Sequence, residues 1–476
     1  MAYDIAELLG KGGRIHFVGI GGSGMFPIVQ ILHSLGHEIS GSDVNEGSII
    51  EYERAMGIDV CIGHKAENVD GASMLVVTAA LFADNPEVAR ANELGIPVIP
   101  RADMFGYITT LYTNSMCVSG THGKTTTTCM LTSILIKAGL DPSALIGGKL
   151  PLINGYGRVG ESSNFVCEAC EFKDTFLHLS PSYSIILNID NDHLDYFGTI
   201  ENSMRSFRRF ADNASQAVVA NLDDANTVKA LEGFSGKIVW FGESEDADYR
   251  ITDAAPYDRA FFRFRLSCRG EDLGEFTLRI PGRQNVFNAA AAIAAASEIG
   301  VSADSAREGL DSFRGAGRRF EMLGEFKGVT VADDYGHHPK ELSVTLDAAL
   351  EMGYDRVIAV FQPFTFSRTK LLLTDFADAL SKADVVVMTA IMGSREKNTY
   401  GISTQDLADL IPGSVWFETF EEVRDHVLSI AKPGDLVLTM GCGDVYKCAH
   451  MILDNGNEYE TETSGLTPGF SLRRTE

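Results

Sequence analysis

The sequence predicts an α/β protein built mainly from parallel sheets flanked by helices and divided into three domains. Two observations lead to this prediction. Short runs rich in β-branched residues alternate with stretches of helical periodicity along almost the whole chain, which is typical of parallel sheets covered by helices. In addition, 476 residues are too many for one ordinary core and suit about three domains.

The first domain is expected to span residues 1–110. It opens with a strand, a glycine turn and a helix whose apolar side chains recur at helical spacing. A new strand near residue 115 restarts this pattern, and the first boundary is therefore placed near residue 110. Strands of this domain are expected at residues 14–18, 40–43, 73–78 and 96–100.

The second domain is expected to span residues 111–314. Between about Asp248 and Ile280 the pattern changes to alternating apolar and polar residues, most clearly at Phe262–Leu266, and this alternation predicts an antiparallel patch. An alanine-rich helix at residues 285–297 closes the domain. Its parallel strands are expected at residues 115–119, 164–168 and 183–189.

The third domain is expected to span residues 315–476 and again alternates strands with helices. The polar residues from about 457 onward, which include Gly465 and Pro468, predict a loosely held tail. Strands of this domain are expected at residues 328–332, 356–361, 384–388 and 435–440.

Charge and composition exclude several classes of function. A net charge of −25 argues against nucleic-acid binding, which needs a basic face. The sequence has no apolar run long enough to span a membrane, and its start lacks the order of a signal peptide. Eight cysteines are too few for a disulfide scaffold, and we interpret Cys167 and Cys170 as free thiols. We therefore expect a cytoplasmic protein.

The sharpest local motif is Val118-Ser-Gly-Thr-His-Gly-Lys-Thr-Thr126, which lies between an expected strand and an expected helix. In this context backbone N–H groups at the helix start bind phosphates, Lys124 adds a positive charge and the Thr125 hydroxyl can bind magnesium. The general phosphate-loop pattern has a glycine where Val118 stands, so this loop is a variant. The residues expected to hold the phosphates of ATP are Gly120, Thr121, His122, Gly123, Lys124, Thr125 and Thr126.

A second glycine-rich segment, Gly19-Ile-Gly-Gly-Ser-Gly24, also joins a strand to a helix, and Asp43 ends the next strand. Alone it fits a dinucleotide site with Asp43 as the ribose-binding acid, another diphosphate site, or merely tight packing of strand on helix. Because the chain already has an ATP-type loop, a nucleotide-linked substrate is favoured over a redox cofactor. The expected contacts are Gly21, Gly22, Ser23, Gly24 and Asp43.

Acidic and imidazole side chains follow two strands of the second domain. Glu168 ends one strand, and Asp192 and His193 lie in the loop after another. The carboxyl ends of parallel strands share one edge of a sheet, so these groups are expected near the phosphate loop. There they suit magnesium ions that neutralise a transferring phosphate. Lys124, Glu168 and His193 are the expected catalytic residues, and Thr125, Glu168 and His193 the expected metal ligands.

Further segments complete an ordered set of motifs along nearly the whole chain. They are Gly41-Ser-Asp43, Asp84-Asn-Pro-Glu87, Pro97-Val-Ile-Pro-Arg101, Glu168-Ala-Cys-Glu171, Asn191-Asp-His-Leu-Asp195, Pro281-Gly-Arg-Gln-Asn-Val-Phe-Asn288, Gly317-Arg-Arg-Phe320, Asp333-Asp-Tyr-Gly-His-His-Pro339, Arg395-Glu-Lys-Asn-Thr-Tyr-Gly401 and Gly441-Cys-Gly-Asp444. Together with the two glycine loops, this set resembles the Mur ligases of peptidoglycan synthesis.

The resemblance implies a Rossmann-like first domain, a central P-loop-type ATPase domain and a Rossmann-like third domain. It implies that ATP and magnesium are used to join L-alanine to the lactyl carboxylate of UDP-N-acetylmuramate through an acyl phosphate. The first glycine loop would hold the UDP part, and ATP would lie between the second and third domains. The resemblance further assigns Asn285, Asn288, Arg319 and Asp334 to the nucleotide, and His337 and Arg368 to the substrate side.

One segment departs from the family pattern. The family commonly has histidine after Phe-Gln-Pro, whereas this chain reads Phe361-Gln-Pro-Phe-Thr-Phe-Ser-Arg368. Arg368 can still bind an amino-acid carboxylate. Phe364 cannot form a hydrogen bond, which leaves open how strictly alanine is selected over glycine or serine.

Three alternatives remain at this point. The related ligase that attaches a preformed tripeptide to the same sugar nucleotide fits less well, because its first glycine loop departs from this one. A nicotinamide-dependent oxidoreductase would leave Lys124 without a purpose, and a non-catalytic regulator would not need Glu168 or His193. We expect a monomer or a weak homodimer.

Overall fold

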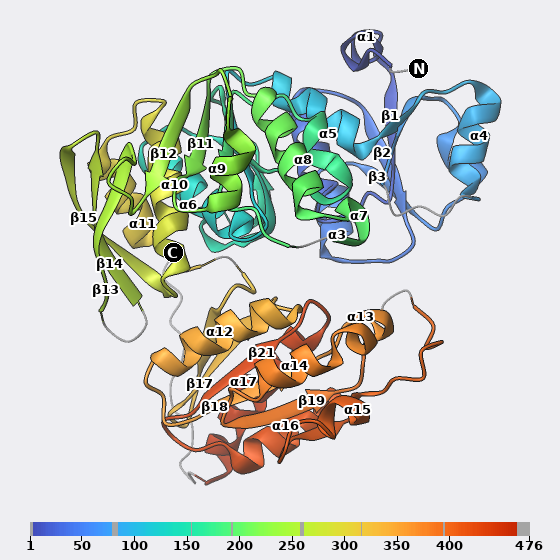
Figure 1. The fold of residues 1–476 in the computed structure, drawn as a ribbon. Helices are drawn as coiled ribbons and strands as arrows, with labels where there is room; N and C mark the ends of the chain where they lie inside the picture. The colour runs from blue at the N-terminus through green and yellow to red at the C-terminus, as the bar shows by residue number, and fades with distance from the viewer. Residues whose placement is uncertain are drawn as a thin grey trace, which may run out of the picture. The chain divides into compact units, whose positions relative to one another are not determined.

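The structure, a computed structural model, describes residues 3–78, 84–153, 155–191, 194–257, 261–315, 317–393 and 396–463. Two compact units make up the fold (Figure 1). The first contains Met1–Tyr257 and Phe261–Ala316, and the second contains Gly317–Glu476. No helix in the described part of the chain is long and apolar enough to cross a membrane.

The first unit begins with a five-stranded parallel sheet in the order β3-β2-β1-β4-β5. This doubly wound order confirms the predicted Rossmann-like class, and it places the loop after β1 where the order reverses. The strands are β1 (Arg14–Val18), β2 (Ile39–Asp43), β3 (Asp59–Ile62), β4 (Ala72–Val77) and β5 (Val98–Pro100). The helices are α1 (Ile5–Gly10), α2 (Phe26–Ser34), α3 (Ser48–Ala55), η1 (Ala66–Val69), α4 (Pro86–Leu94) and α5 (Arg101–Thr110).

A ten-stranded sheet follows in the same unit, in the order β15-β14-β13-β12-β11-β10-β6-β9-β7-β8. Its strands are β6 (Asn114–Ser119), β7 (Ser143–Leu150), β8 (Gly155–Arg158), β9 (Asn164–Glu168), β10 (Tyr183–Ile186), β11 (Ala217–Asn221), β12 (Ile238–Gly242), β13 (Tyr249–Tyr257), β14 (Phe261–Cys268) and β15 (Glu271–Pro281). The last three pair antiparallel with one another, which confirms the predicted antiparallel patch. They form one end of the sheet in Figure 1.

The helices of this second sheet include the two that carry expected nucleotide-binding residues. These are α6 (Lys124–Lys137) and α10 (Gln284–Ser297). The alanines of α10 are fully buried, and such small side chains allow helices to approach closely. The others are η2 (Pro151–Ile153), η3 (Phe172–His178), α7 (Leu194–Phe197), α8 (Ile200–Asp212), α9 (Ala225–Leu231) and α11 (Ala303–Ser312).

The two sheets of the first unit share a hydrophobic core. Phe105 of α5 meets Phe165 of β9 edge to face, with ring centroids 6.4 Å apart. A side chain at Gly106 would place its Cβ 2.1 Å from the carbonyl oxygen of His178, so glycine allows α5 to lie directly against η3. The first two expected domains therefore form one compact body.

The second unit has a six-stranded sheet in the order β16-β17-β21-β18-β19-β20, antiparallel only at β16. Its strands are β16 (Glu321–Phe326), β17 (Val329–Asp334), β18 (Val357–Phe361), β19 (Val385–Thr389), β20 (Val415–Phe417) and β21 (Leu436–Met440). Its helices are α12 (Pro339–Glu351), α13 (Phe366–Leu371), α14 (Leu373–Leu380), α15 (Thr404–Ala408), α16 (Phe420–Ile430) and α17 (Val445–Thr463).

Helices cover both faces of this sheet (Figure 1). In β18, Ala359 and Phe361 pack into the core beneath α12 and α14, while Ile358 and Val360 pack into the core beneath α16 and α17. Burial on both faces explains the continuous apolar runs in the sequence. The backbone of residues 457–463, placed in the expected tail, continues helix α17, and residues 464–476 lie outside the described part.

Candidate active site

The phosphate loop has the local structure that its sequence predicts. Strand β6 ends at Ser119 and α6 begins at Lys124, so the loop spans the residues between them. Gly120 and Gly123 have φ values of +139° and +87°, which side chains rarely adopt. A Cβ on Gly123 would lie 2.4 Å from Oδ1 of Asn288, so space as well as backbone angle requires glycine.

The start of α6 is open to an anion. The first N–H groups of a helix have no acceptor within it, and no side chain caps α6. Asn188, in the segment after β10, holds the preceding loop, because its carbonyl oxygen accepts from the N–H of Thr121 at 3.0 Å and its Oδ1 accepts from that of His122 at 2.8 Å. These contacts leave the helix N-terminus free for phosphate.

Lys124 lies folded back over its own loop. Its Nζ donates to the carbonyl oxygens of Gly120 at 2.5 Å and Thr121 at 3.1 Å, and it lies 3.0 Å from Oε2 of Glu171. Burial alone would lower the pKa of Lys124, but the nearby groups, led by the charge and hydrogen bond of Glu171 and including Glu168, together outweigh it and raise that pKa. Glu171 was not among the expected site residues, and its position three residues after Glu168 in one motif is the signal that could have indicated it.

Glu168 lies beside the phosphate loop, as expected. Strands β6 and β9 are neighbours, with Val118 opposite Glu168, and the carboxylate contributes to the charge acting on Lys124. Its Oε1 accepts from the N–H of Gly147 at 2.6 Å. The negative charge and the carboxylate oxygens of Glu168 suit the binding of a magnesium ion next to phosphates. Asp192 and His193 lie outside the described residues, and no cluster of three candidate metal ligands is found among those described.

Two asparagines of α10, both expected to bind the nucleotide, lie close to the phosphate loop. Asn288 and Asn285 are buried and joined by a hydrogen bond of 2.9 Å from Nδ2 of Asn288 to Oδ1 of Asn285. Asn285 in turn donates to the carbonyl oxygen of Pro281 at 2.7 Å. Oδ1 of Asn288 faces Gly123, so α10 presents an amide to the phosphate loop.

The first glycine loop lies between β1 and α2, and it is tied to Asp43 at the end of β2. Oδ2 of Asp43 accepts from the N–H of Gly21 at 3.0 Å. Helix α2 has no side-chain cap, but the N–H of Phe26 already donates to the carbonyl oxygen of Gly22 at 3.0 Å and Pro27 has no N–H, so this helix start offers an anion fewer donors than that of α6. Asp43 therefore already holds the loop in shape, in addition to any contact with a ribose.

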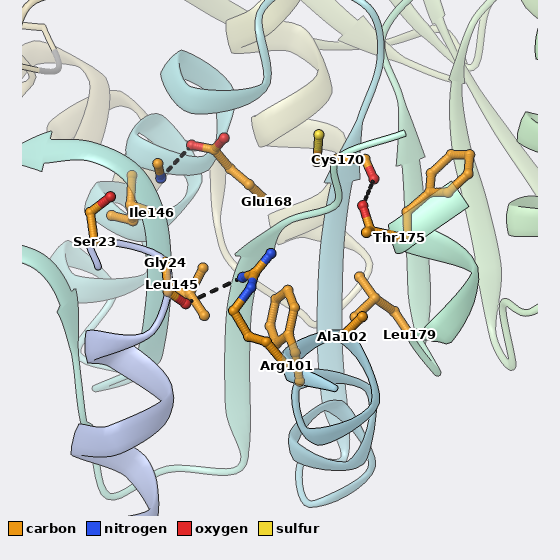
Figure 2. Close-up of a pocket in the computed structure, with 13 residues that line it drawn as sticks. Ser23, Gly24, Arg101, Ala102, Leu145, Ile146, Glu168, Cys170, Thr175 and Leu179 are labelled. Carbon is orange, nitrogen blue, oxygen red and sulfur yellow. Dashed lines mark hydrogen bonds between the residues drawn. The ribbon is translucent and has the colours of Figure 1, made fainter. Parts of the chain in front are cut away.

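A cavity of about 140 Å³ connects the first glycine loop with Glu168 (Figure 2). Ser23 and Gly24 line one side, while Glu168 and Cys170 line another. The remaining walls include Arg101, Phe105, Leu145, Ile146 and Phe176. The first unit thus brings two of the expected sites to one space, and it adds Arg101, which ends one of the sequence motifs but had no expected role.

In the second unit Asp334 and Arg319 lie near one another. Asp334 is buried and accepts from the N–H groups of Phe320 at 2.9 Å and Gly336 at 2.8 Å. Burial raises the pKa of Asp334 even though the positive charge of Arg319 acts to lower it. The guanidinium of Arg319 lies over the ring of Tyr335, 5.2 Å from its centroid. Arg319 is thereby held beside the carboxylate.

His337, Phe364 and Arg368 form a neighbouring group in that unit. The rings of His337 and Phe364 are 6.4 Å apart and roughly perpendicular. Burial lowers the pKa of His337, and the charge of Arg368 lowers it further against the opposing effect of Glu341. Nη1 of Arg368 is buried without a hydrogen-bond partner among the described residues. An unpaired guanidinium nitrogen beside a neutral histidine suits an anionic ligand such as a carboxylate.

Comparison with known proteins defines the class of this fold and site. Family models match three successive segments: the Mur ligase family catalytic domain at residues 14–113, the Mur ligase middle domain at 118–296, and the Mur ligase glutamate ligase domain at 318–443. Relatives more than 40% identical align with over nine-tenths of the chain. This chain belongs to the Mur ligase family.

The names of individual relatives state a more specific activity. UDP-N-acetylmuramate–L-alanine ligase of Caldanaerobacter subterraneus subsp. tengcongensis is 43% identical over 451 residues, which cover 94% of this chain and 98% of the relative. The enzyme of the same name from Agathobacter rectalis is 43% identical over 447 residues, or 92% and 97%. Membership of a ligase family removes the reason to interpret the first glycine loop as an oxidoreductase site.

Solved structures agree with the fold. The UDP-N-acetylmuramate–alanine ligase of Thermotoga maritima has a TM-score of 0.79 at 28% identity, covering 94% of this chain and all of that one. A murein peptide ligase from Psychrobacter arcticus has a TM-score of 0.70 at 23% identity, covering 94% and 99%. The similarity to the murein peptide ligase, at 23% identity, supports the fold alone.

Proposed function

We propose that this chain uses ATP to join L-alanine to the lactyl carboxylate of UDP-N-acetylmuramate, the first step in building the peptide stem of peptidoglycan precursors. The relatives that align with nearly all of the chain bear the name of this activity. In the structure, the observation that carries the proposal is the uncapped start of α6 with Lys124 beside it. This arrangement suits the transfer of a phosphoryl group.

The reaction needs ATP because an amine does not displace oxide from a carboxylate at a useful rate. A carboxylate oxygen attacks the γ-phosphorus of ATP, which forms an acyl phosphate and releases ADP. The amine nitrogen of L-alanine then attacks the carbonyl carbon, and the tetrahedral intermediate expels phosphate as the nitrogen loses a proton. The N–H groups at the start of α6 and the ammonium of Lys124 would hold the phosphate and neutralise its charge.

The remaining site residues of the first unit are proposed to orient the two nucleotides. Gly21, Gly22, Ser23 and Gly24 would meet the diphosphate of the sugar nucleotide, while Asn285 and Asn288 would hold ATP. Thr125, Glu168 and His193 would hold magnesium, which when bound neutralises charge on the transferring phosphate.

Residues of the second unit are also proposed to bind the substrates. Arg319 and Asp334 would contact ATP. Arg368, with its unpaired buried Nη1, would bind the carboxylate of L-alanine, and His337 would lie beside it. Phe364, whose ring faces His337, would then present an apolar wall to the small side chain of the amino acid.

A cytoplasmic location and a monomer or weak homodimer are proposed together with this function. All eight cysteines lie in the described part of the chain and are free thiols. Even Cys117 and Cys167 on neighbouring strands form no disulfide: the thiol of Cys167 donates a hydrogen bond to the sulfur of Cys117 at 3.4 Å. Free thiols are typical of a reducing compartment, where ATP is also available.

Phosphate release measures the proposed reaction directly. The purified protein is incubated with ATP, magnesium and UDP-N-acetylmuramate, and L-alanine is compared with glycine, L-serine and the tripeptide L-alanyl-γ-D-glutamyl-meso-diaminopimelate. We expect L-alanine to give the highest kcat/KM and phosphate release to require the sugar nucleotide. Turnover with the tripeptide comparable to that with L-alanine would overturn the assignment.

A further inference from the structure

The cavity between the first glycine loop and Glu168 is lined by one positively charged side chain, that of Arg101. Arg101 occupies the first position of α5, immediately after β5. Figure 2 shows its side chain extending from α5 toward the space bordered by Gly24, with Cys170 and Glu168 beyond it. Most of the other lining side chains are apolar, so the guanidinium is the chief polar group on this wall.

Arg101 lacks the partners that a guanidinium in such a place ordinarily has. Among the described residues its hydrogen bonding is confined to one long contact, from Nη1 to the carbonyl oxygen of Gly24 at 3.3 Å. No carboxylate of the described residues forms an ion pair with it. Burial lowers the pKa of Arg101, as expected for a charge removed from water without a counter-ion. Five N–H donors and a full charge are therefore largely uncompensated.

The nearby carboxylate is directed elsewhere. Oε1 of Glu168 accepts from the N–H of Gly147, and the other neighbouring acid, Asp103, pairs with His178. Gly24 permits the close approach of the guanidinium, since a Cβ there would lie 3.1 Å from Nη1 of Arg101. The site thus accommodates the side chain of Arg101, while none of the described residues forms an ion pair that would neutralise its charge.

The cavity has room for a ligand. Its volume of about 140 Å³ is enough for an anionic group such as a carboxylate or a phosphate. Cys170 is close enough to both Arg101 and Lys124 to interact with each charge, so the cavity extends from the first glycine loop toward the phosphate loop. A sugar nucleotide that contacts the first glycine loop and also reaches the phosphate loop would pass through this space.

We propose that Arg101 binds an anionic group of the sugar nucleotide, an inference that rests on the function proposed above. A planar guanidinium is suited to a two-pronged contact with a carboxylate or a phosphate. Two groups of that substrate have this chemistry: the diphosphate, which belongs with Gly24, and the lactyl carboxylate, which belongs with Glu168. The two sources are separated by experiment.

Binding is measured by titration calorimetry without ATP, so that the readout does not depend on turnover. Arg101→Gln is compared with wild type and with Arg90→Gln, a control in the same domain whose exposed side chain pairs with Asp70. The ligands are UDP-N-acetylmuramate and UDP-N-acetylglucosamine, which has the same diphosphate but no lactyl group. We expect Arg101→Gln to bind UDP-N-acetylmuramate at least about tenfold more weakly, the usual effect of losing a charged hydrogen bond, and Arg90→Gln to bind it as wild type does.

The comparison ligand identifies the source of the anion. An equal loss for UDP-N-acetylglucosamine assigns Arg101 to the diphosphate. A loss confined to UDP-N-acetylmuramate, or a wild-type protein that binds only that ligand, assigns it to the lactyl carboxylate.

Two results would count against these ideas, and they differ. Wild-type protein that does not bind UDP-N-acetylmuramate would overturn the proposed function. Wild-type binding together with unchanged affinity in Arg101→Gln would overturn only the role of Arg101. If Arg101→Gln does not fold, Arg101→Lys takes its place, since it keeps the charge and loses the two-pronged geometry; unchanged affinity in that variant would likewise overturn the role.

Discussion

Replacing Lys124 by alanine is expected to affect stability as well as turnover. The side chain of Glu171 is only 3% exposed, and that of Lys124 is 17% exposed. Removal of the lysine leaves a buried carboxylate without its counter-ion, a change that typically costs roughly 3–5 kcal/mol. For a folded unit of this size that is a fall of about 6–10 °C in Tm.

A second substitution separates the charge from the loss of contacts. In the double variant Lys124→Ala with Glu171→Gln, the uncompensated charge is gone, so we expect at least half of the lost Tm to return. Glu171→Gln alone leaves Lys124 with the carbonyl oxygens of Gly120 and Thr121 and is expected to lower Tm less than Lys124→Ala. Thermal unfolding at neutral pH, followed by circular dichroism, measures all four proteins.

Phosphate release provides an independent readout in the same proteins. Both variants without Lys124 should be inactive, whereas Glu171→Gln should still turn over because it keeps the cation. A Lys124→Ala protein with wild-type Tm would refute the reasoning about the buried pair. So would a double variant less stable than the single one.

Three further substitutions test separate features. Burial, together with the charge of Asp43, raises the pKa of Glu53 from its usual 4.5 to about 8. The folded chain therefore keeps a proton that the unfolded chain loses, and stability falls as pH rises through that window. Between pH 5 and 8, Glu53→Gln should have a higher Tm than wild type, with a gain in the free energy of unfolding on the order of a few kcal/mol at the upper end; a pH-independent difference would contradict this. Phe364→His should lower the ratio of kcat/KM for L-alanine to kcat/KM for L-serine. In wild type the apolar ring leaves the serine hydroxyl without a hydrogen-bond partner, which costs about 1–3 kcal/mol. An unchanged ratio would show that Phe364 does not determine this specificity. Gly123→Ala should raise the KM for ATP, since its Cβ would displace Asn288. The control is Gly139→Ala beyond the opposite end of the same helix, where the added Cβ meets nothing within 4 Å at a similar positive φ; it should lose only stability, about 1–2 kcal/mol. Equal KM values in both variants would show that the clash has no effect.

Much of the fold could be predicted because its strands are buried on both faces and appear in the sequence as continuous apolar runs. The β18 segment Val357–Phe361 is one example. Strands β7 and β8 were not anticipated, because Ser143–Leu150 and Gly155–Arg158 contain several glycines and lack a clear run of β-branched residues. Strand β7 depends on pairing with β9, and β8 depends on pairing with β7, which local propensity does not encode.

The candidate site likewise has some features that could be predicted from the sequence and others that could not. The two glycine loops could be predicted because each depends on a short segment between a strand and a helix. The pair of Lys124 and Glu171 depends on β6 and β9 lying side by side, although the residues are far apart in sequence. Arg101 could not be distinguished from a solvated arginine at the start of a helix, because its surroundings come from four separate segments of the chain.

The hydrophobic core shared by the first two sheets has a consequence for how this protein can be divided. A fragment ending at residue 110 would expose Phe105 and Ile108, and its remainder would expose Phe165. Neither piece would be expected to be soluble alone. A cut at residue 316 falls between two bodies that each keep their own core. In chimeras with relatives, the first two sheets should therefore be exchanged together, and the last unit can be exchanged separately.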